Sequence, residues 1–440
     1  MGTGMETLLG FTDCEIIKTE TTKDNGREIF IFYLRYIGSC PDFCDECGCK
    51  LYKHGTRHMK IIDTPMFGKP VCIDLEFPRY RCSGAPVCKN IWQPTFEYID
   101  DKRKMTKRAF SDISQRSLRT TFEEVSQDYN ITANTIKNVF LEYVEEHASQ
   151  LTFKTPCFLG IDEIKIKKLG EITVITDLEH RTIFDMLPKR NQPALTAYFN
   201  NVKDADKVLW VCSDMYRPFE KSIKGAMHNA QWVIDHFHVV MKANEALDYV
   251  RREIQDSMSK KERINTKKGL ANTLKTRRRD LLTEEAEKIR KVRKSEMHRP
   301  MAIAYDLKED FFDIYDNNME SKENAQKAFN EWEKAIPDDP LFMKFKELAK
   351  TVHNFYEQIF NFWDCPIAIT NAYTETSNRL IRENNLRGRG YSFDVLRSRT
   401  LYRKKNLEKI INSGMMIGPA IPESGAIFHF DSEKDEGEDE

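Results

Sequence analysis

The sequence predicts a multidomain α+β protein: an N-terminal zinc ribbon, a helix-turn-helix, and an α/β core that an all-helical insertion interrupts. Three observations predict this. Cysteine pairs cluster before residue 90, short apolar runs ending in carboxylates follow between residues 157 and 235, and a long charged helical stretch comes next. A chain of 440 residues has room for roughly two to four domains. The predicted boundaries are 1–39 (N-terminal segment), 40–98 (zinc ribbon), 105–150 (helix-turn-helix), 155–245 (first part of the core), 246–357 (helical insertion), 358–412 (last part of the core) and 413–440 (acidic tail).

Paired cysteines define the predicted zinc ribbon. Cys44 and Cys47 have two residues between them and are followed by glycine, and Cys82 and Cys88 form a second pair after an alternating, strand-like stretch at 71–80. Two thiolates at such spacing reach one ion from a tight turn, and four of them make a closed structural site. We therefore expect one structural Zn²⁺ on these four cysteines.

Other residues near the ribbon could also be zinc ligands. Cys40 and Cys49 lie beside the first pair, and His54 or His58 could replace one thiolate. Before the ribbon, residues 28–37 give one predicted strand. Basic and aromatic residues that suit contact with a DNA backbone interleave with the ribbon: Lys53, His54, Arg57, His58, Arg79, Tyr80 and Arg81.

Two predicted helices after the ribbon are spaced like a helix-turn-helix. Phe122, Val125 and Tyr129 share a helical face, Asn130 interrupts the pattern, and Thr132 is the predicted N-cap of the second helix. An ordinary helical hairpin has the same periodicity and stays open as an alternative. In a helix-turn-helix, the second helix would present four polar residues to a major groove: Asn134, Thr135, Lys137 and Asn138.

Successive strands form the predicted core. Strand-like runs occupy 157–167, 171–177, 181–187, 207–214 and 231–235, with helical spacing at 193–202 and 217–227. This order describes a mixed sheet covered by helices, as in an RNase H-like nuclease core. Asp162 and Asp214 lie at strand ends, and two carboxylates on adjacent strands suit Mg²⁺ or Mn²⁺. Glu163 must point to the opposite face of its strand and is not expected to be a ligand.

The predicted insertion is strongly basic. Between residues 251 and 294, sixteen basic residues accompany seven acidic ones. A charge run is usually a solvated helical face, but the length of this one favours contact with phosphates. We expect Arg277, Arg278 and Arg279 to bind DNA without sequence preference.

The third acid of the site is the least obvious from the sequence. Glu375 shares a predicted helical face with Arg379 and Arg382. Such a cluster is most often a surface salt-bridge patch, but a core with two carboxylates needs a third acid. The two arginines would then hold DNA phosphates. If Glu375 is not the ligand, Glu383 or Asp394 is next.

Composition favours a cytoplasmic protein associated with the nucleoid. No apolar run approaches the roughly 20 residues of a membrane span, and the N-terminus lacks a signal-peptide pattern. The net charge of −1 is unevenly distributed, because the last ten residues hold seven acids and one lysine. The remaining 430 residues are therefore basic, which permits a polyanionic partner.

The ordered motifs resemble those of the DDE transposases of the bacterial ISL-three insertion-sequence family. The four-cysteine ribbon looks like that family's zinc finger, and GIDEIKIKK and VCSDMYRPF resemble its segments for the first and second catalytic Asp. VIDHFHVVMKANEALDYVRR looks like the Asp-x-x-His block, and TNAYTETSNRLIR followed by RGRGYSFDVLRSR resembles the region of the catalytic Glu. The sequence departs from the family at position 228, where His replaces a common Pro, and around the glutamate, where larger residues replace small ones: Tyr373, Thr374 and Thr376.

The resemblance implies a transposase that binds the terminal inverted repeats of an insertion sequence, then cleaves and joins DNA. Asp162, Asp214 and Glu375 would be the catalytic acids, holding two Mg²⁺ (or Mn²⁺) ions per active site, and His238 would lie beside the scissile phosphate. The implied partners are double-stranded DNA, as element ends and target, and a second copy of the chain in the synaptic complex. Two alternatives remain: a catalytically inert DNA-binding regulator, and a structure-specific nuclease that only hydrolyses.

Overall fold

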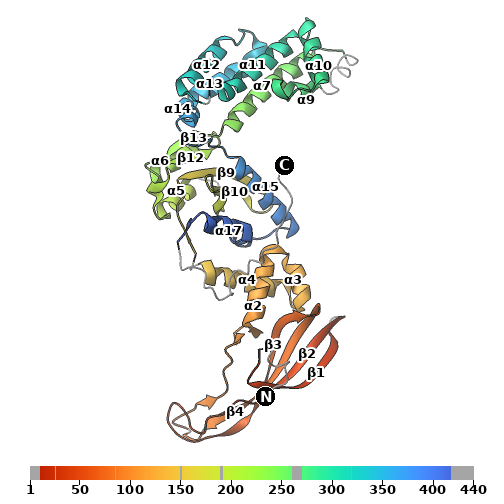
Figure 1. The fold of residues 1–440 in the computed structure, drawn as a ribbon, viewed down its shortest axis with the longest axis vertical. Helices are drawn as coiled ribbons and strands as arrows, with labels where there is room; N and C mark the ends of the chain where they lie inside the picture. The colour runs from red at the N-terminus through yellow and green to blue at the C-terminus, as the bar shows by residue number, and fades with distance from the viewer. Residues whose placement is uncertain are drawn as a thin grey trace. The chain divides into compact units, whose positions relative to one another are not determined.

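The structure, a computed structural model, describes residues 10–24, 26–84, 86–100, 102–148, 151–188, 192–259, 270–318 and 320–417. Nearly all of the predicted acidic tail lies outside these residues. Contacts divide the chain into two units. Unit 1 comprises Met1–Thr152, Leu386–Lys405 and Met416–Glu440, and unit 2 comprises Phe153–Asn385 and Asn406–Met415. Each unit is described by itself (Figure 1).

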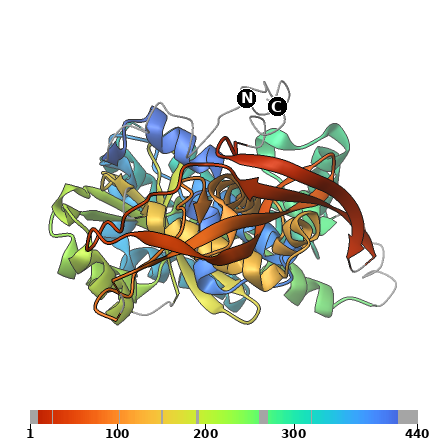
Figure 2. The same ribbon diagram turned by 90° about the horizontal axis from the view of Figure 1, so that it is seen from below.

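A seven-stranded sheet forms the base of unit 1, and its long strands run side by side in Figure 2. The strand order is β1-β2-β4-β3-β7-β6, and β5 pairs with β4. Its apolar face buries Leu34, Ile61, Ile73 and Leu75 completely. The strands are β1 Cys14–Asp24, β2 Arg27–Tyr36, β3 Leu51–Met66, β4 Lys69–Cys82, β5 Ile91–Trp92, β6 Ile99–Asp100 and β7 Met105–Thr106.

The sequence predicted only part of this sheet. The expected strands at 28–37 and 71–80 are confirmed as β2 and β4, whereas β1 and β3 were not predicted. Residues 52–58 of β3 are all exposed, so that stretch has no alternation of apolar and polar residues to reveal a strand. The cysteine ribbon is thus one end of a larger sheet.

Three helices follow the sheet in unit 1: α2 Lys107–Arg119, α3 Phe122–Tyr129 and α4 Ala133–Ala148. The predicted break between the last two is confirmed, because Asn130 adopts the left-handed conformation with φ 52°. The Thr132 hydroxyl accepts a hydrogen bond from the Thr135 N–H at 3.1 Å, as an N-cap does. Helix α2 precedes the two helices of the predicted helix-turn-helix.

Residues 386–405 belong to unit 1. They fall within 358–412, which was predicted to be the last part of the core. They include α16, Phe393–Leu401. The buried Arg399 guanidinium donates to the carbonyls of Ser117 and Thr120, where α2 ends. Tyr391 meets the ring of Phe122 edge-on, with 5.6 Å between centroids.

Unit 2 contains a five-stranded sheet in the order β11-β10-β9-β12-β13. Strands β9, β10 and β11 are antiparallel to one another, and β12 is parallel to both β9 and β13. All five predicted strands and both predicted helices between them are confirmed. The elements are β9 Phe158–Ile166, β10 Gly170–Asp177, β11 Thr182–Leu187, α5 Gln192–Asn201, β12 Trp210–Ser213, α6 Arg217–Ala226, β13 Gln231–Ile234, α15 Ala372–Arg387 and α17 Lys404–Asn412.

The described residues of the region predicted as an all-helical insertion, 246–357, form helices. These helices share one continuous apolar core with the sheet of unit 2. They are α7 His236–Asp256, α9 Leu270–Lys275, α10 Thr283–Lys294, α11 Arg299–Asn317, α12 Lys322–Lys334, α13 Met343–Asn354 and α14 Tyr356–Phe360. Among the helices that the structure describes, none is long and apolar enough to cross a membrane.

Candidate active site and cysteine centre

Four cysteines of unit 1 form a cysteine centre. The sulfur atoms of Cys44, Cys47, Cys82 and Cys88 all lie within 4.8 Å of one another. The first pair comes from the turn before β3, Cys82 ends β4, and Cys88 comes from the following loop. Four thiols around one point are the donor set of a structural zinc site, which has no open position for a substrate.

The surroundings of the centre favour the thiolate form of Cys44, whereas burial and the neighbouring thiols raise the pKa of Cys82 and that of Cys88. Burial opposes ionisation of Cys44, but the Glu46 N–H, the Asn90 amide and the Cys47 N–H lower the pKa of its thiol to about 7. The Asn90 amide donates to the Cys44 sulfur at 3.4 Å. The chain therefore provides the second layer of hydrogen bonds that metal-binding thiolates need.

The other candidate ligands lie outside the four-thiol group. Cys49 lies close to the centre. Its sulfur is 3.3 Å from the position that a Cβ would take at Gly84, and the Cys82 sulfur is 3.4 Å from the same position. His58 is on β3 and hydrogen-bonds the Asp74 carboxylate at 3.0 Å. His54 is on the same strand, with its side chain exposed, and Cys40 neighbours the Tyr80 hydroxyl.

Three aspartates lie in a row across the sheet of unit 2. Cys212 of β12 pairs with Gly160 of β9, so the same register places Asp214 beside Asp162. Ser213 pairs with Ile234 of β13, which places Asp235 on the other side of Asp214. Neighbouring positions on adjacent parallel strands point to the same face, about 5 Å apart. The sheet alone therefore gathers three carboxylates.

Helix α15 carries Glu375, the fourth acid of the site, and its N-terminal end packs closely against the sheet. The Asn371 amide donates to the Ile161 carbonyl of β9 at 3.0 Å, and the Thr374 hydroxyl is 2.6 Å from that of Thr176 on β10. These contacts close over Gly160, where a Cβ would lie 2.5–2.6 Å from neighbouring oxygens. One turn further on, the Asn378 amide donates to Asp162 Oδ2 at 2.7 Å. Glu375, between these contacts, must face the row of aspartates.

The tightest group in this site is Asp235, His238 and Glu375, whose ligand atoms lie within 4.8 Å of one another. His238 Nε2 is 3.9 Å from Glu375 Oε1. Asp235 begins α7, and its carboxylate accepts a hydrogen bond from the Phe237 N–H at 3.4 Å, which fixes the histidine one turn into the helix. All four residues predicted to be catalytic thus occur in one neighbourhood.

Electrostatics make this neighbourhood suited to a cation. Asp235 is 1% exposed, and its Oδ2 has no hydrogen-bond partner among the described residues. Burial, together with the nearby Asp214 and Asp235, raises the pKa of Asp162. Burial and the charge of Asp235 likewise raise the pKa of Glu375. A divalent cation bound by these oxygens would relieve the burial of negative charge, and hard carboxylate oxygens are the donors that Mg²⁺ prefers.

Two residues of this site were not among the predicted ligands. The resemblance to the Asp-x-x-His block placed Asp235 beside the active site without a ligand role, and Asn378 shares the predicted helical face of Glu375 but was given no role. The signal for Asn378 is its spacing of three from Glu375. Glu383, one alternative third acid, forms an ion pair with Arg379 at 3.2 Å, and the other, Asp394, is on α16 and belongs to unit 1.

The predicted DNA-contact residues have different surroundings. On α4, Asn134 and Asn138 are exposed and Thr135 and Lys137 half-buried, opposite the buried Ile136. Arg379 and Arg382 of α15 are exposed, so both remain candidates for phosphate contact.

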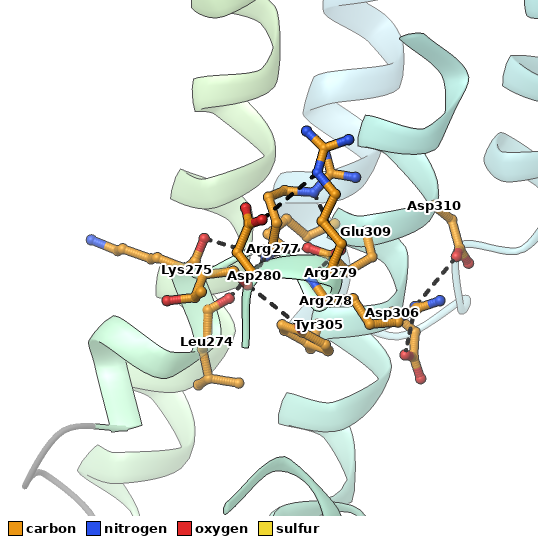
Figure 3. A network of polar contacts seen from close by, with 12 residues as sticks. Leu274, Lys275, Arg277, Arg278, Arg279, Asp280, Tyr305, Asp306, Glu309 and Asp310 are labelled. Atoms are coloured by element: carbon orange, nitrogen blue, oxygen red, sulfur yellow. Dashed lines mark hydrogen bonds and ion pairs between the residues drawn. The ribbon is translucent and has the colours of Figure 1, made fainter. Parts of the chain in front are cut away.

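The arginine triplet of the insertion is already paired with acids (Figure 3). Arg277 pairs with Glu309, Asp313 and Asp316 of α11, at 2.9–3.3 Å. Arg278 pairs with Asp306 at 3.2 Å, and Arg279 with Asp316 at 3.1 Å. These arginines join the loop after α9 to an acidic face of α11, which weighs against the predicted role in phosphate contact.

Two family models match this sequence. Residues 159–400, more than half of the chain, match the ISL3 (ISL-three) model, whose description is "Transposase". Residues 41–88 match the zinc finger of the transposases of IS204, IS1001, IS1096 and IS1165. The transposase for insertion sequence element IS1001 of Bordetella parapertussis is 25% identical over 257 residues, which are 56% of this chain and 61% of that relative. The match thus spans about three-fifths of the relative's length.

Proposed function

The chain belongs to the ISL3 family of DDE transposases, and we propose that it binds the terminal inverted repeats of an insertion sequence and catalyses metal-dependent DNA cleavage and strand transfer. The observation that carries this proposal is the convergence of Asp162, Asp214 and Asp235 on adjacent strands with Glu375 and His238. Such a cluster, in a sheet of this topology, is what an RNase H-like nuclease core needs.

The proposed roles follow from position. Asp162, Asp214 and Glu375 would hold divalent ions, two Mg²⁺ or Mn²⁺ per site, and Asp235 would contribute a further carboxylate beside them. Bound divalent ions supply an activated attacking oxygen and stabilise the leaving oxygen. Asn378 orients Asp162 by its hydrogen bond. His238, held at the start of α7, lies beside the scissile phosphate.

Several parts of the chain contact DNA in this proposal. The cysteine ribbon, with one structural Zn²⁺, and the α3–α4 pair, acting as a helix-turn-helix, bind the element ends. The polar residues of α4 contact the major groove: Asn134, Thr135, Lys137 and Asn138. Arg379 and Arg382 contact phosphates near the cleavage site, and two copies of the chain bind two ends in the synaptic complex.

The test uses Glu375→Gln and Asp162→Asn with a duplex carrying the element's own end. Both changes keep side-chain shape and remove a charge that would hold an ion. We expect a normal footprint and cleavage reduced by at least about a hundredfold, a loss that Mg²⁺ or Mn²⁺ does not restore. Glu383→Gln is the matched control, because this acid lies on the same helix and pairs with Arg379 instead. Normal cleavage by Glu375→Gln would show that Glu375 is not one of the catalytic acids.

A joining assay separates the two alternatives from the proposal. The wild-type protein is given a pre-cleaved end with a free 3′-hydroxyl and a target duplex. Joined product supports a transposase. Hydrolysis without joining indicates a structure-specific nuclease, and neither reaction by a protein that footprints the ends indicates a regulator.

A further inference from the structure

Strands β3 and β4 extend beyond β1 and β2 of their sheet, and the two-residue β5 pairs with their far end at Tyr80 and Arg81. Strand β2 pairs with β4 only as far as Arg35 and Glu76, whereas β3 and β4 stay paired from there to Leu51 and Cys82, where the cysteine centre begins. We call residues 52–58 of β3 and 77–81 of β4 the arm. In Figure 1 this part of β4 projects away from β1 and β2.

The arm is basic and contains no acid. Every residue from 52 to 58 is exposed. Lys53 and Arg57 on β3 and Arg79 and Arg81 on β4 carry its charge. The cross-strand pairs place Tyr80 opposite Lys53 and Arg81 opposite Tyr52, so aromatic and cationic side chains alternate.

These cations lack the partners that others in the protein have. In unit 1, Arg103 pairs with three acids, Arg108 with Asp63, and Arg116 with two acids. In the described residues, no ion pair joins an acid to Lys53, Arg79 or Arg81 of the arm, and the Nε of Arg79 is buried without a hydrogen-bond partner. The arm is therefore an unneutralised patch, unlike the arginine triplet of Figure 3.

Protection of a sheet edge does not explain this charge. Exposed edge strands often carry lysine or arginine, which prevents pairing with another chain, and this accounts for β3. Arg79 and Arg81, however, are on β4, which lies between β3 and β5. Their charge on an inner strand needs another reason.

The backbone of the arm is bent. The pairing skips His54 between Lys53↔Tyr80 and Gly55↔Arg79, which makes a bulge. Gly55 has φ +117° with open space around its Cβ position, so the backbone conformation, and not crowding, requires glycine. A bulge increases the right-handed twist of paired strands. Strands β3 and β4 form a two-stranded ribbon between the end of the β2 pairing and the two-residue β5, and a two-stranded ribbon fits the major groove of duplex DNA.

We propose that the arm is the part of the cysteine ribbon that contacts duplex DNA: the twisted β3–β4 ribbon enters a major groove, and Lys53, Arg79 and Arg81 contact phosphates. This inference rests on the proposed function. The contact belongs to the stem of the arm and not to the cysteine turn, because that turn carries Asp42, Asp45 and Glu46, which repel phosphates.

The experiment compares two double variants of the full chain. Lys53→Gln/Arg81→Gln removes two charges from the arm, and Lys18→Gln/Lys23→Gln removes two exposed charges from β1 of the same sheet. Each phosphate contact contributes about 0.9 to the slope of log K against log salt. We expect the arm variant to reduce that slope by about two and to lose one edge of the footprint on the element's end. The β1 variant should keep both.

Zinc content and the urea midpoint show whether the arm variant is folded, and Lys53→Arg provides a charge-conserving check that should bind normally. An unchanged slope in a folded arm variant would overturn the inference, as would equal losses in both double variants. A larger loss for single-stranded RNA than for duplex DNA would overturn it as well. If the wild-type protein itself fails to bind the ends, the proposed function fails instead.

Discussion

At the scale of single residues, Gly160 decides how closely α15 approaches the sheet. A Cβ there would lie 2.5 Å from Thr374 Oγ1 and 2.6 Å from both Asn371 Oδ1 and Thr176 Oγ1, all in a buried hydrogen-bonded group. Gly160→Ala must therefore push the helix away, at a cost of about 1–3 kcal/mol. We expect a lower urea midpoint and weaker cleavage, because Glu375 moves with the helix.

The control for this change is Gly225→Ala. Gly225 is exposed on α6 with nothing within 4 Å of its Cβ position, so alanine should leave stability unchanged or raise it by up to about 1 kcal/mol. If Gly160→Ala matches this control in both stability and cleavage, the contact over Gly160 does not position Glu375.

A second prediction at this scale concerns pH. Burial raises the pKa of Asp162 above its ordinary value of about 3.9. The folded state then binds this proton more tightly than the unfolded chain, so in metal-free protein Asp162 destabilises the fold increasingly as pH rises from about 4 through the raised pKa. Asp162→Asn removes this effect.

We expect urea denaturation to show Asp162→Asn gaining stability over the wild type between pH 4 and pH 7. Mg²⁺ at neutral pH should stabilise the wild type more than the variant, because bound ligand stabilises the folded state. A stability difference that is independent of pH would mean that the Asp162 carboxyl is not buried as the structure places it.

At the scale of elements, the cysteines themselves make up most of the small buried cluster at the cysteine centre. The buried cluster around it consists of Cys44, Leu51, Cys82 and Cys88. Without a metal ion, this cluster has little apolar surface to hold the turns together. Chelation, or Cys88→Ser, should release one Zn²⁺ per chain and open residues 40–98 to protease while unit 2 stays intact. Freshly purified protein without zinc would contradict this prediction.

The loop between α9 and α10 gives a prediction that replaces one made from sequence. Lys308 of α11 is fully buried and donates to the carbonyls of Leu274 and Thr276 at 3.0 and 3.1 Å, and it pairs with Glu309 at 2.6 Å. Lys308→Met removes this buried donor from both carbonyls and one of the two cations that pair with Glu309, and it should cost about 3–5 kcal/mol. Thermal or urea unfolding measures the loss.

Lys291→Met on α10 is the control, because Lys291 is exposed and should change stability by less than about 0.5 kcal/mol. By the same reasoning, reversal of Arg277, Arg278 and Arg279 should mainly destabilise the insertion instead of weakening binding to any duplex. A Lys308→Met protein as stable as the control would show that this network does not hold the loop.

At the scale of the whole molecule, the sequence predicted what depends on neighbouring residues. The strands from β9 to β13 were found because apolar runs and their polar ends are local signals. Glu375 on α15 was also expected at the site, but the contacts that dock this helix were not, because Asn378 and Asp162 are 216 positions apart. The same limit applies to the arginine triplet, whose acidic partners on α11 come about thirty residues later. Counting charges in one stretch cannot show that its partners lie in another.

The two units carry different functional groups. The cysteine centre, α4 and the arm belong to unit 1, and the carboxylate row belongs to unit 2. If unit 1 binds DNA and unit 2 cuts it, Lys137→Ala should weaken end binding, yet bound complexes should be cleaved at the wild-type rate. Asp214→Asn should show the reverse. Single-turnover cleavage at saturating protein, measured beside the footprint, separates these outcomes. If saturated Lys137→Ala complexes are not cleaved, recognition by α4 must act on the chemical step itself, and the two units cannot be functionally independent.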